Sequence, residues 1–250
     1  MGCCDKARAG SVALGMGVVA AGAAGMAYAV RSPRSDVFGP SVWRGPQDRP
    51  AVALTFDDGP SESTPEILEV LERHRARATF FQVGLNVRRL PDISRQVFAA
   101  GHEIGNHSYT HLLLALRSRG VIEEEFARAQ QIIAETTGLS PWLMRAPFGV
   151  RWFGFRQVQR RLGLLGVMWS VLGYDWKRTT RFIVDRLKAR VANGAIICLH
   201  DGRQLQPRPD VRATLEAVRI LVPWIQEQGY RLETVSQLLC PMNSSSASAL

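Results

Sequence analysis

The chain has 250 residues, of which 46% are hydrophobic, and a formal net charge of +9. This length and composition are those of a globular protein with one sizeable core, and they exclude a wholly disordered chain. The positive charge suits contact with anionic surfaces. The chain has neither zinc-finger spacing nor an aromatic RNA-binding motif, so we predict no nucleic-acid partner.

Residues 1–30 predict an export signal. Lys6 and Arg8 precede an uncharged run from Ser11 to Val30, which contains the small-x-small pattern of a signal-peptidase site at residues 27–29. The run is nearly long enough to span a bilayer. Two alternatives therefore stay open: cleavage after Ala29, or retention as an anchor in which residues 11–30 contact the membrane. In both cases we expect an exported, extracytoplasmic protein.

The rest of the chain divides by composition. Residues 31–49 predict a linker, because they are rich in proline and mixed charge and show no hydrophobic period. The folded domain is predicted over residues 50–240, and we expect it to be a monomer. Residues 241–250 are rich in serine and alanine and predict a disordered tail.

Strands and helices are predicted to alternate through the domain. Short apolar runs predict strands over residues 51–56, 78–83, 102–105, 143–145, 164–171, 195–199 and 230–233. Helical spacing and terminal signals predict helices that begin near Ser63 and others over residues 92–100, 121–137, 180–192 and 211–228. This alternation predicts an α/β fold with parallel strands joined by crossover helices.

Polar clusters fall where the predicted strands end. Functional residues of parallel barrels gather at this position. The clusters are Asp57-Asp58, His107 and His111, Arg145, Asp175 and His200. Five such coincidences indicate a site more strongly than any single motif does.

The stretch Thr55–Pro60 places two adjacent carboxylates directly after a predicted buried strand. Burying Asp57 and Asp58 is costly unless they bind a metal or take part in acid–base chemistry. An ordinary turn is the alternative, because Asp-Asp-Gly is also common in turns. The histidines described next favour the functional interpretation.

His107 and His111 are four residues apart, so a helical turn would place both imidazoles on one face. With the Asp58 carboxylate they would form a three-ligand site with an open position, as catalytic zinc requires. Two surface histidines are the alternative interpretation. The strand predicted over residues 102–105 leads into the pair, which favours the metal site.

The remaining polar residues suggest acid–base roles. If Asp58 binds a metal, Asp57 is free to take a proton from water whose pKa the metal lowers. We expect Arg145 to hold Asp57 ionised through a bidentate pair, with a structural ion pair as the alternative. His200 would act as a general acid that Asp175 keeps protonated, with a strand-end turn as the alternative.

The four cysteines do not form the pattern of a disulfide framework. Cys3 and Cys4 precede the apolar leader, Cys198 lies in a predicted core strand, and Cys240 follows the last predicted helix. We interpret Cys198 as a buried free thiol. A bridge between Cys198 and Cys240 stays open for an exported protein.

Taken together, these motifs resemble those of the polysaccharide deacetylases with a NodB-homology domain (carbohydrate esterase family 4). The resemblance covers about Pro50 to Leu239. It rests on five short motifs in the family's order: Thr55–Gly59, His107–His111, Arg145–Gly149, Asp175-Trp176 and Cys198–His200. It implies a single domain that is a distorted (β/α) barrel of about seven parallel strands, preceded by the apolar leader.

The resemblance also implies a reaction: hydrolysis of N-acetyl groups on a polymer of the N-acetylglucosamine type, such as peptidoglycan or a chitin-like glycan. A divalent metal, usually Zn2+, would be held by Asp58, His107 and His111. Water at the metal would attack the acetyl carbonyl, with Asp57 as the base and His200 as the acid.

Three further residues are implied as substrate-binding: Pro147, Phe148 and Trp176. The backbone N–H near Phe148 would help to hold the oxyanion. Trp176 would form a wall against the acetyl methyl group or a sugar ring, with a core tryptophan as the alternative.

Three positions depart from the family's pattern. Phe148 stands where tyrosine is usual, which removes a hydroxyl but keeps the backbone N–H. Leu172 stands where many relatives carry aspartate, which bears on the polar support of that loop. Cys198 replaces the usual leucine, an apolar exchange from which we expect little consequence.

Two alternatives to N-deacetylation remain. An esterase acting on O-acetylated xylan or wall polymer would use the same chemistry on another bond. A carbohydrate-binding protein on a catalytically impaired barrel would use none of it. The intact catalytic and metal-ligating positions argue against the second alternative.

Overall fold

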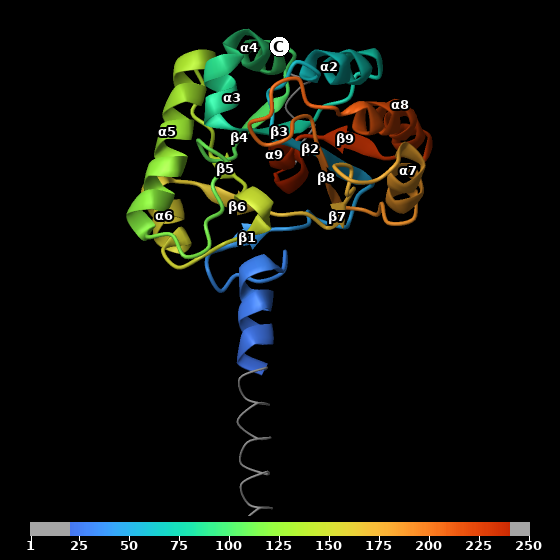
Figure 1. Cartoon of the computed structure of the whole chain (residues 1–250). Helices are drawn as coiled ribbons and strands as arrows, with labels where there is room; N and C mark the ends of the chain where they lie inside the picture. Colours follow the sequence, from blue (N-terminus) through green and yellow to red (C-terminus); the bar gives the residue numbers. More distant parts are fainter. Residues whose placement is uncertain (1–20, 241–250) are drawn as a thin grey trace, which may run out of the picture.

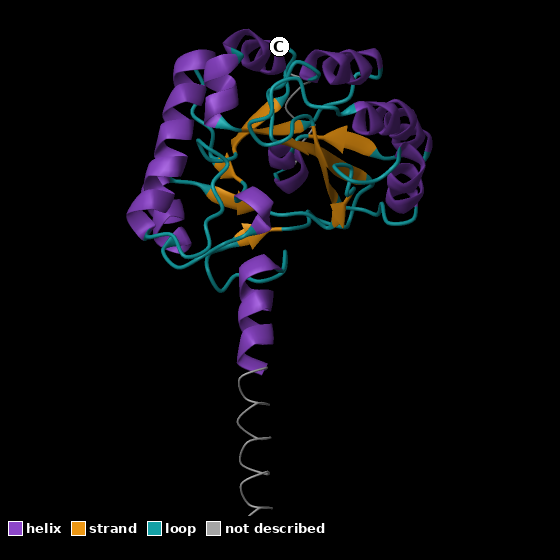
Figure 2. Cartoon of the chain, in the orientation of Figure 1, coloured by secondary structure: helices purple, strands orange, loops and turns teal. Residues whose placement is uncertain are grey.

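The computed structural model describes residues 21–240, so the predicted tail and the first part of the predicted leader lie outside it. In Figure 1 a curled sheet occupies the centre of the domain and helices surround it, and Figure 2 separates the two kinds of element by colour. The strands are β1 Ser41–Val42, β2 Ala51–Asp57, β3 Thr79–Gln82, β4 Glu103–Asn106, β5 Leu143–Met144, β6 Leu165–Val167, β7 Val171–Leu172, β8 Ile196–His200 and β9 Arg231–Glu233.

The helices lie between these strands along most of the chain. They are one helix over residues 21–31, then α2 Thr64–Arg73, α3 Gly84–Arg89, α4 Pro91–Ala99, α5 Arg119–Thr137, α6 Phe155–Leu162, α7 Thr180–Lys188, α8 Arg212–Glu227 and α9 Val235–Leu239, with a 3-10 turn at Pro147–Gly149. The predicted alternation of strands and helices is confirmed. The short elements β1, α3, α6 and α9 were not predicted.

All paired strands run parallel, in the order β1-β6-β5-β4-β3-β2-β8-β7, with β9 beside β2. Strand β7 is the last in this order and β6 is the second, yet only residues 168–170 separate them along the chain. The sheet must therefore curl so that its two ends approach each other. This confirms the predicted distorted barrel.

The single strand predicted over residues 164–171 is wrong. Leu165–Val167 pairs with β5 and β1, whereas Val171–Leu172 pairs with β8. At the break, the carbonyls of Val167 and Met168 accept hydrogen bonds from the Arg145 guanidinium instead of from a neighbouring strand. The apolar run is continuous in sequence, but this arginine interrupts its pairing.

Part of the predicted linker belongs to the sheet. Ser41 and Val42 lie in register with Gly166 and Val167 of β6, and Arg44 forms a bridge with Ala195. Two paired residues are too few to produce a hydrophobic period, so the sequence did not indicate this strand.

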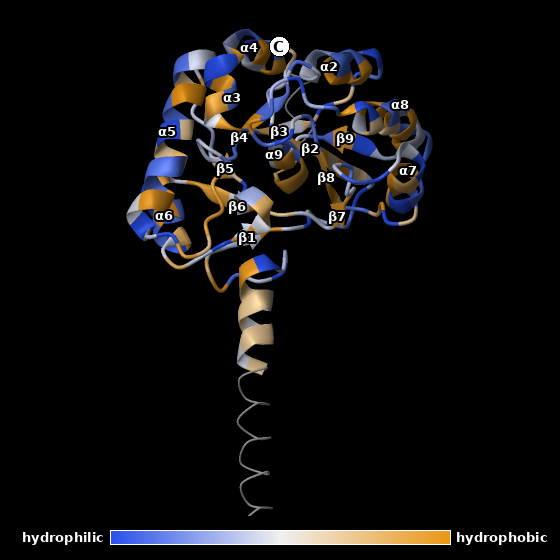
Figure 3. Cartoon of the chain, viewed as in Figure 1, coloured by the Kyte–Doolittle hydropathy of each residue, from blue (hydrophilic) through white to orange (hydrophobic). Residues whose placement is uncertain are grey.

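The helix over residues 21–31 projects from the domain beside β1 (Figure 1). Its residues 21–28 are exposed and carry no charge, and Figure 3 shows the projecting part of this helix in the pale colours of mild hydrophobicity. Within residues 21–240, no helix combines the length and hydropathy needed to cross a bilayer.

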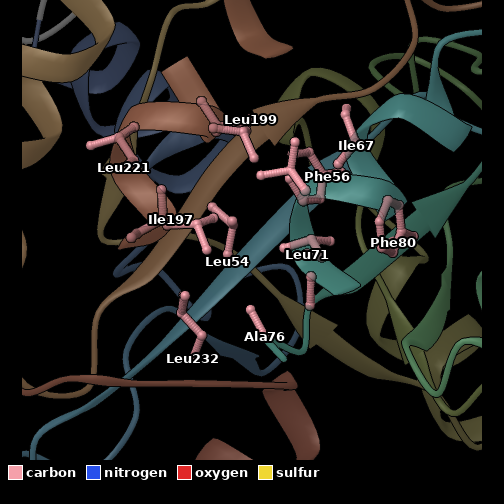
Figure 4. Close-up of a cluster of buried hydrophobic side chains, with 14 of the residues drawn as sticks. Leu54, Phe56, Ile67, Leu71, Ala76, Phe80, Ile197, Leu199, Leu221 and Leu232 are labelled. Atoms are coloured by element: carbon pink, nitrogen blue, oxygen red, sulfur yellow. The ribbon is translucent and has the colours of Figure 1, made fainter. Parts of the chain in front are cut away.

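The main core lies between the central strands and the helices that cover one face of the sheet. Strand β2 is buried along its whole length, as expected for a parallel strand covered on both sides. Figure 4 shows Leu54 and Phe56 of β2 facing Leu71 of α2 and Leu221 of α8. This core holds β2 and β8 in place, and both strands end in residues of the site.

Leu221→Ala is expected to lower the free energy of unfolding by about 2–5 kcal/mol, because it leaves a cavity in this core. Leu221 is 1% exposed, whereas its neighbour Ile220 on the same helix is 44% exposed. Ile220→Ala is the matched control and is expected to cost less than about 1 kcal/mol. Urea unfolding followed by circular dichroism measures both, and equal losses would contradict the assigned packing.

Candidate active site

The predicted site residues converge at the carboxyl ends of the strands. Asp57 ends β2, His200 ends β8, and Arg145 directly follows β5. A pocket of about 1050 Å³ opens there, and Asp57, His200 and the candidate metal ligands line it. The structure thus brings polar residues from separate strand ends to one pocket.

Asp58, His107 and His111 form a buried group of metal-ligating type. The Asp58 Oδ1 atom lies 2.9 Å from Nε2 of His111 and 3.4 Å from Nε2 of His107. Burial alone would raise the pKa of the Asp58 carboxyl, but the His107 and His111 imidazoles beside it outweigh this and hold the pKa well below its usual range. The carboxylate is therefore ionised, as a metal ligand must be.

One backbone contact fixes the orientation of His107. Its Nδ1 lies 2.8 Å from the carbonyl oxygen of Arg145, which can only accept a hydrogen bond. In the neutral imidazole the proton is therefore on Nδ1, and Nε2 presents a lone pair towards Asp58. Metal-binding histidines are commonly oriented in this way by a partner of their other nitrogen.

The three residues fit a divalent metal. Asp58 Oδ1 is buried and receives no hydrogen bond from residues 21–240, so converging lone pairs surround a position suited to a cation. Ligand atoms about 2.0 Å from a tetrahedral zinc ion stand roughly 3.3 Å apart, close to the two separations measured here. Two imidazole nitrogens and one carboxylate oxygen leave a fourth position open.

The backbone around these ligands is not the predicted helical turn. Residues 107–111 form a loop, and Ser108 and His111 have positive φ values of 64° and 58°. Asp58 also lies in the left-handed region, with φ of 72°. Such conformations are unfavourable outside glycine and concentrate at functional sites. The histidines therefore meet through two left-handed residues rather than through helical spacing.

Asp57 lies beside the metal-ligand group and is paired with Arg145. The Arg145 Nη1 atom lies 2.6 Å from Asp57 Oδ1 and donates a second hydrogen bond to Thr55. The predicted bidentate pair is wrong, because the other guanidinium nitrogens donate to the carbonyls of Val167 and Met168. Arg145 is fully buried, so it balances the Asp57 charge without access to solvent.

Cys198 also contacts Asp57. Its Sγ lies 3.4 Å from Asp57 Oδ2, and the thiol is buried. Burial and the nearby carboxylates raise the pKa of this thiol well above its usual range, so it stays protonated and donates. The buried free thiol was predicted, but its contact with Asp57 was not. Cys240 is exposed and also free, so the bridge left open by the sequence is absent from the described residues.

His200 and Asp175 form the second predicted pair. His200 Nδ1 lies 2.9 Å from Asp175 Oδ1, and the backbone N–H of His200 donates to the same carboxylate. Thr214 donates a further hydrogen bond of 2.6 Å to Asp175. Burial opposes a charged imidazole, but the Asp175 carboxylate outweighs it and raises the pKa of His200 to about 9. The imidazole is therefore protonated at neutral pH.

Of the three residues implied as substrate-binding, two line the pocket and one does not. Phe148 and Trp176 line the pocket and are 44% and 41% exposed. Phe148 packs edge-on against His111, and Trp176 packs in the same way against His200. Pro147 is buried and does not line the pocket, because its ring begins the 3-10 turn beneath Phe148.

The 3-10 turn exposes one backbone donor. Phe148 has φ of 57°, and no acceptor for its N–H lies among residues 21–240, whereas the next two N–H groups bond to Ala146 and Pro147. A donor on the pocket wall next to His111 is suited to stabilising developing negative charge.

Two supporting residues carried no signal in the sequence. Asn86 donates hydrogen bonds to the Asp58 carbonyl and to the Gln204 carbonyl. The backbone N–H of Gln204 donates to Asp58 Oδ2 at 2.9 Å. These contacts orient the carboxylate, but they join segments that are far apart in the chain, and neither residue lies in a recognisable motif.

Comparison with known proteins places these features in one family. The family profile for polysaccharide deacetylases matches residues 44–167. A chitooligosaccharide deacetylase of Bradyrhizobium sp. (strain ANU 289) is 35% identical over 197 residues, which cover 75% of this chain and 90% of the relative.

A peptidoglycan-N-acetylglucosamine deacetylase of Listeria monocytogenes, PgdA, is 33% identical over 189 residues. The match covers 75% of this chain but only 38% of that longer protein. Among solved structures, the Bc1960 peptidoglycan N-acetylglucosamine deacetylase superposes with a TM-score of 0.74 at 29% identity, covering 79% of this chain and 91% of that one. The chain belongs to the polysaccharide deacetylase family.

Proposed function

We propose that the protein is a metal-dependent hydrolase that removes N-acetyl groups from a polysaccharide containing N-acetylglucosamine. One observation carries this proposal: the buried Asp58–His107–His111 group lies beside Asp57, and His200 faces the same pocket. The relatives described above are named as deacetylases of peptidoglycan or of chitooligosaccharides, which supports this class of substrate.

Asp58, His107 and His111 would hold the metal. Two imidazoles and one carboxylate in a site with an open position are typical of catalytic zinc, so we propose Zn2+. When bound, the metal supplies a Lewis acid that polarises the acetyl carbonyl and makes water more acidic. The protein's own residues supply the proton transfers.

Asp57 would accept the proton of the attacking water. Arg145 and Cys198 both donate to its carboxylate, so it is oriented before the substrate binds. As the water oxygen bonds to the acetyl carbon, the Phe148 N–H would donate to the carbonyl oxygen. His200 would then protonate the sugar nitrogen, the carbon–nitrogen bond breaks, and acetate and a free amine result.

Phe148 and Trp176 would form the sugar-facing walls. Each presents an aromatic surface to the pocket while its edge contacts a site histidine. Aromatic faces pack against the apolar faces of pyranose rings. The acetamido group would then point between the two walls towards Asp57.

We propose that the protein acts outside the cytoplasm, next to the polymer, as a monomer. The uncharged residues 11–30 would direct export, and they would either be cleaved after Ala29 or stay as a membrane anchor. The catalytic domain would span about residues 50–240, with β1 as a strand contributed from the preceding segment.

The proposal is tested by acetate release. Purified protein is incubated with N-acetylglucosamine oligomers, solubilised peptidoglycan and O-acetylated xylan, with zinc or with a chelator. We expect metal-dependent acetate release together with new free amines on one of the first two substrates. Release from xylan alone would favour the esterase, and binding without release would favour a carbohydrate-binding protein.

In the metal-free protein, the His200 imidazole is expected to titrate near pH 9, and Asp175→Asn is expected to lower its pKa. The general acid must be protonated, so the alkaline limb of the activity profile should move to lower pH in this variant. His200 gains its partner on folding, so this stabilisation is complete below pH 6.5 and disappears as pH rises through about 9.

NMR titration of the imidazole resonances measures the pKa of His200, and a pH–rate profile measures the shift of the alkaline limb. Asp185→Asn changes an exposed carboxylate away from the pocket and is the matched control. An unchanged His200 pKa in Asp175→Asn would contradict the proposed role of the pair.

A further inference from the structure

The last residues of the helix over residues 21–31, together with the segment that joins it to β1, are packed against the domain. Ala29, Val30 and Phe38 are buried in a small cluster with Val150, which follows the 3-10 turn. The hydroxyl of Ser35 donates to the Ala29 carbonyl at 3.1 Å. This segment therefore has a fixed position beside the loop that carries Phe148.

Arg151 holds this segment in place. Its side chain is 1% exposed, and its guanidinium donates hydrogen bonds to the carbonyls of Ser32 and Ser35. Its backbone N–H donates to the Val30 carbonyl at 3.1 Å. No carboxylate lies within ion-pair distance of Arg151 in residues 21–240, so these backbone carbonyls take the place of a carboxylate for its two terminal nitrogens, while Nε has no partner among the described residues. Moving the segment would leave that charge unpaired, which is strongly unfavourable.

This arrangement places Arg31 and Pro33 on the wall of the active-site pocket. Two further cations line the same pocket: Lys177 from the loop after β7 and Arg203 from the loop after β8. Arg203 is engaged with the Asp175 carboxylate and carbonyl. Among residues 21–240, neither Arg31 nor Lys177 has a carboxylate within ion-pair distance.

The negative charges in the pocket do not balance these cations. Asp57 and Asp58 are the carboxylates that line it, and Arg145 and the two histidines already face them. Lys177 has its Nζ 5.6 Å from the ring centre of Tyr174 and 5.8 Å from that of Trp176. Its ammonium group therefore stands over the aromatic wall proposed to hold the sugar.

We infer that Arg31 and Lys177 form a binding site for a carboxylate carried by the glycan, next to the N-acetylated sugar that reacts. The inference rests on the proposed function and adds the chemical class of its substrate: an acidic glycan rather than a neutral one. Peptidoglycan offers such groups, because the lactyl ether on alternate sugars has a free carboxylate wherever no stem peptide is attached to it. A neutral chitin oligomer offers the two cations nothing to pair with.

The test compares three tetrasaccharides of matched length: the alternating glycan with free lactyl carboxylates, the same glycan with these groups converted to primary amides, and a neutral N-acetylglucosamine tetramer. The proteins are wild type, Arg31→Ala, Lys177→Ala and the double variant. Arg181→Ala is the control, because that side chain is 92% exposed and does not line the pocket.

Each single variant is expected to raise KM for the acidic glycan by up to about fivefold, and the double variant by more, with kcat little changed. KM for the amidated and neutral glycans should stay the same. Arg31→Lys and Lys177→Arg keep the positive charge, so their KM for the acidic glycan should lie close to that of the wild type. Added salt should reduce the difference in KM between the acidic and amidated glycans.

Equal increases in KM for the acidic and amidated glycans would overturn the inference, because they would show that the variants change the shape of the pocket rather than its charge. Unchanged KM in the double variant would overturn it as well. If the wild type released no acetate from any of the three, the proposed function would fail. Calorimetric binding of the same glycans to wild type and double variant would then decide the carboxylate site separately.

Discussion

Asp57→Asn is expected to lower kcat by about 10²–10⁴-fold, because asparagine keeps the shape of the carboxylate but cannot accept the proton of the attacking water. The amide oxygen of the introduced asparagine can still receive the hydrogen bond that Arg145 now donates to Asp57. Zinc content and thermal stability should therefore remain close to those of the wild type. Steady-state acetate release and metal analysis measure the two quantities on one preparation.

The control for Asp57→Asn is Asp92→Asn, which removes a carboxylate from the exposed face of α4. It is expected to leave kcat unchanged. Loss of zinc from Asp57→Asn would identify Asp57 as a ligand rather than a base. A kcat within a few-fold of the wild type would show that Asp57 is not the base and would make the Asp58 carboxylate the next candidate for that role.

The second large effect is expected from the metal ligands. His107→Ala should abolish tight zinc binding and, with it, acetate release, because it removes one of three donors from a buried site. Zinc at 100 times its dissociation constant should stabilise the wild type by about 2.7 kcal/mol. The variant should show no such gain, so thermal unfolding with and without zinc tests the site without an activity assay.

His74→Ala is the matched control for His107→Ala, because His74 follows α2 and lies outside the pocket. It should bind zinc and gain stability like the wild type. Chelation of the wild type should reproduce the state of His107→Ala, and added zinc should reverse it. Full zinc binding by His107→Ala would contradict the assigned ligand set.

Much of the fold was predictable because parallel strands covered on both faces are continuous apolar runs. Strand β2 was predicted within one residue, and β8, predicted over residues 195–199, begins and ends one residue later. The run over residues 164–171 looked the same, yet it divides between the second and the last strands in the order of the sheet. Periodicity shows that residues are buried, but it does not show which strand they pair with.

The candidate ligands and acid–base residues were predictable because they lie in short motifs at strand ends. The way in which they meet was not. His107 and His111 converge through left-handed backbone at Ser108 and His111, and no pattern of side chains specifies that conformation. The four-residue spacing of the two histidines suggested a helical turn, but spacing alone does not show that residues 107–111 form a loop.

Contacts between distant segments were the least predictable part of the site. Cys198 was expected to be an apolar replacement, but its thiol donates to Asp57. The register of β2 with β8 places Cys198 opposite Thr55, whose side chain is on the same face of β2 as that of Asp57. Arg31 belonged to a predicted linker, and only the buried Arg151 shows why that segment lies on the pocket wall. Tertiary packing decides both contacts.

Arg145 connects the two halves of the site through one residue. Its guanidinium holds Asp57, and its backbone carbonyl accepts the hydrogen bond from His107. The separation of the proposed proton acceptor and the proposed metal ligand is thus set largely by the internal geometry of a single buried arginine. Thermal motion of the surrounding loops should change it little. Substitutions in those loops should therefore change the proposed substrate preference without disturbing the proposed chemistry.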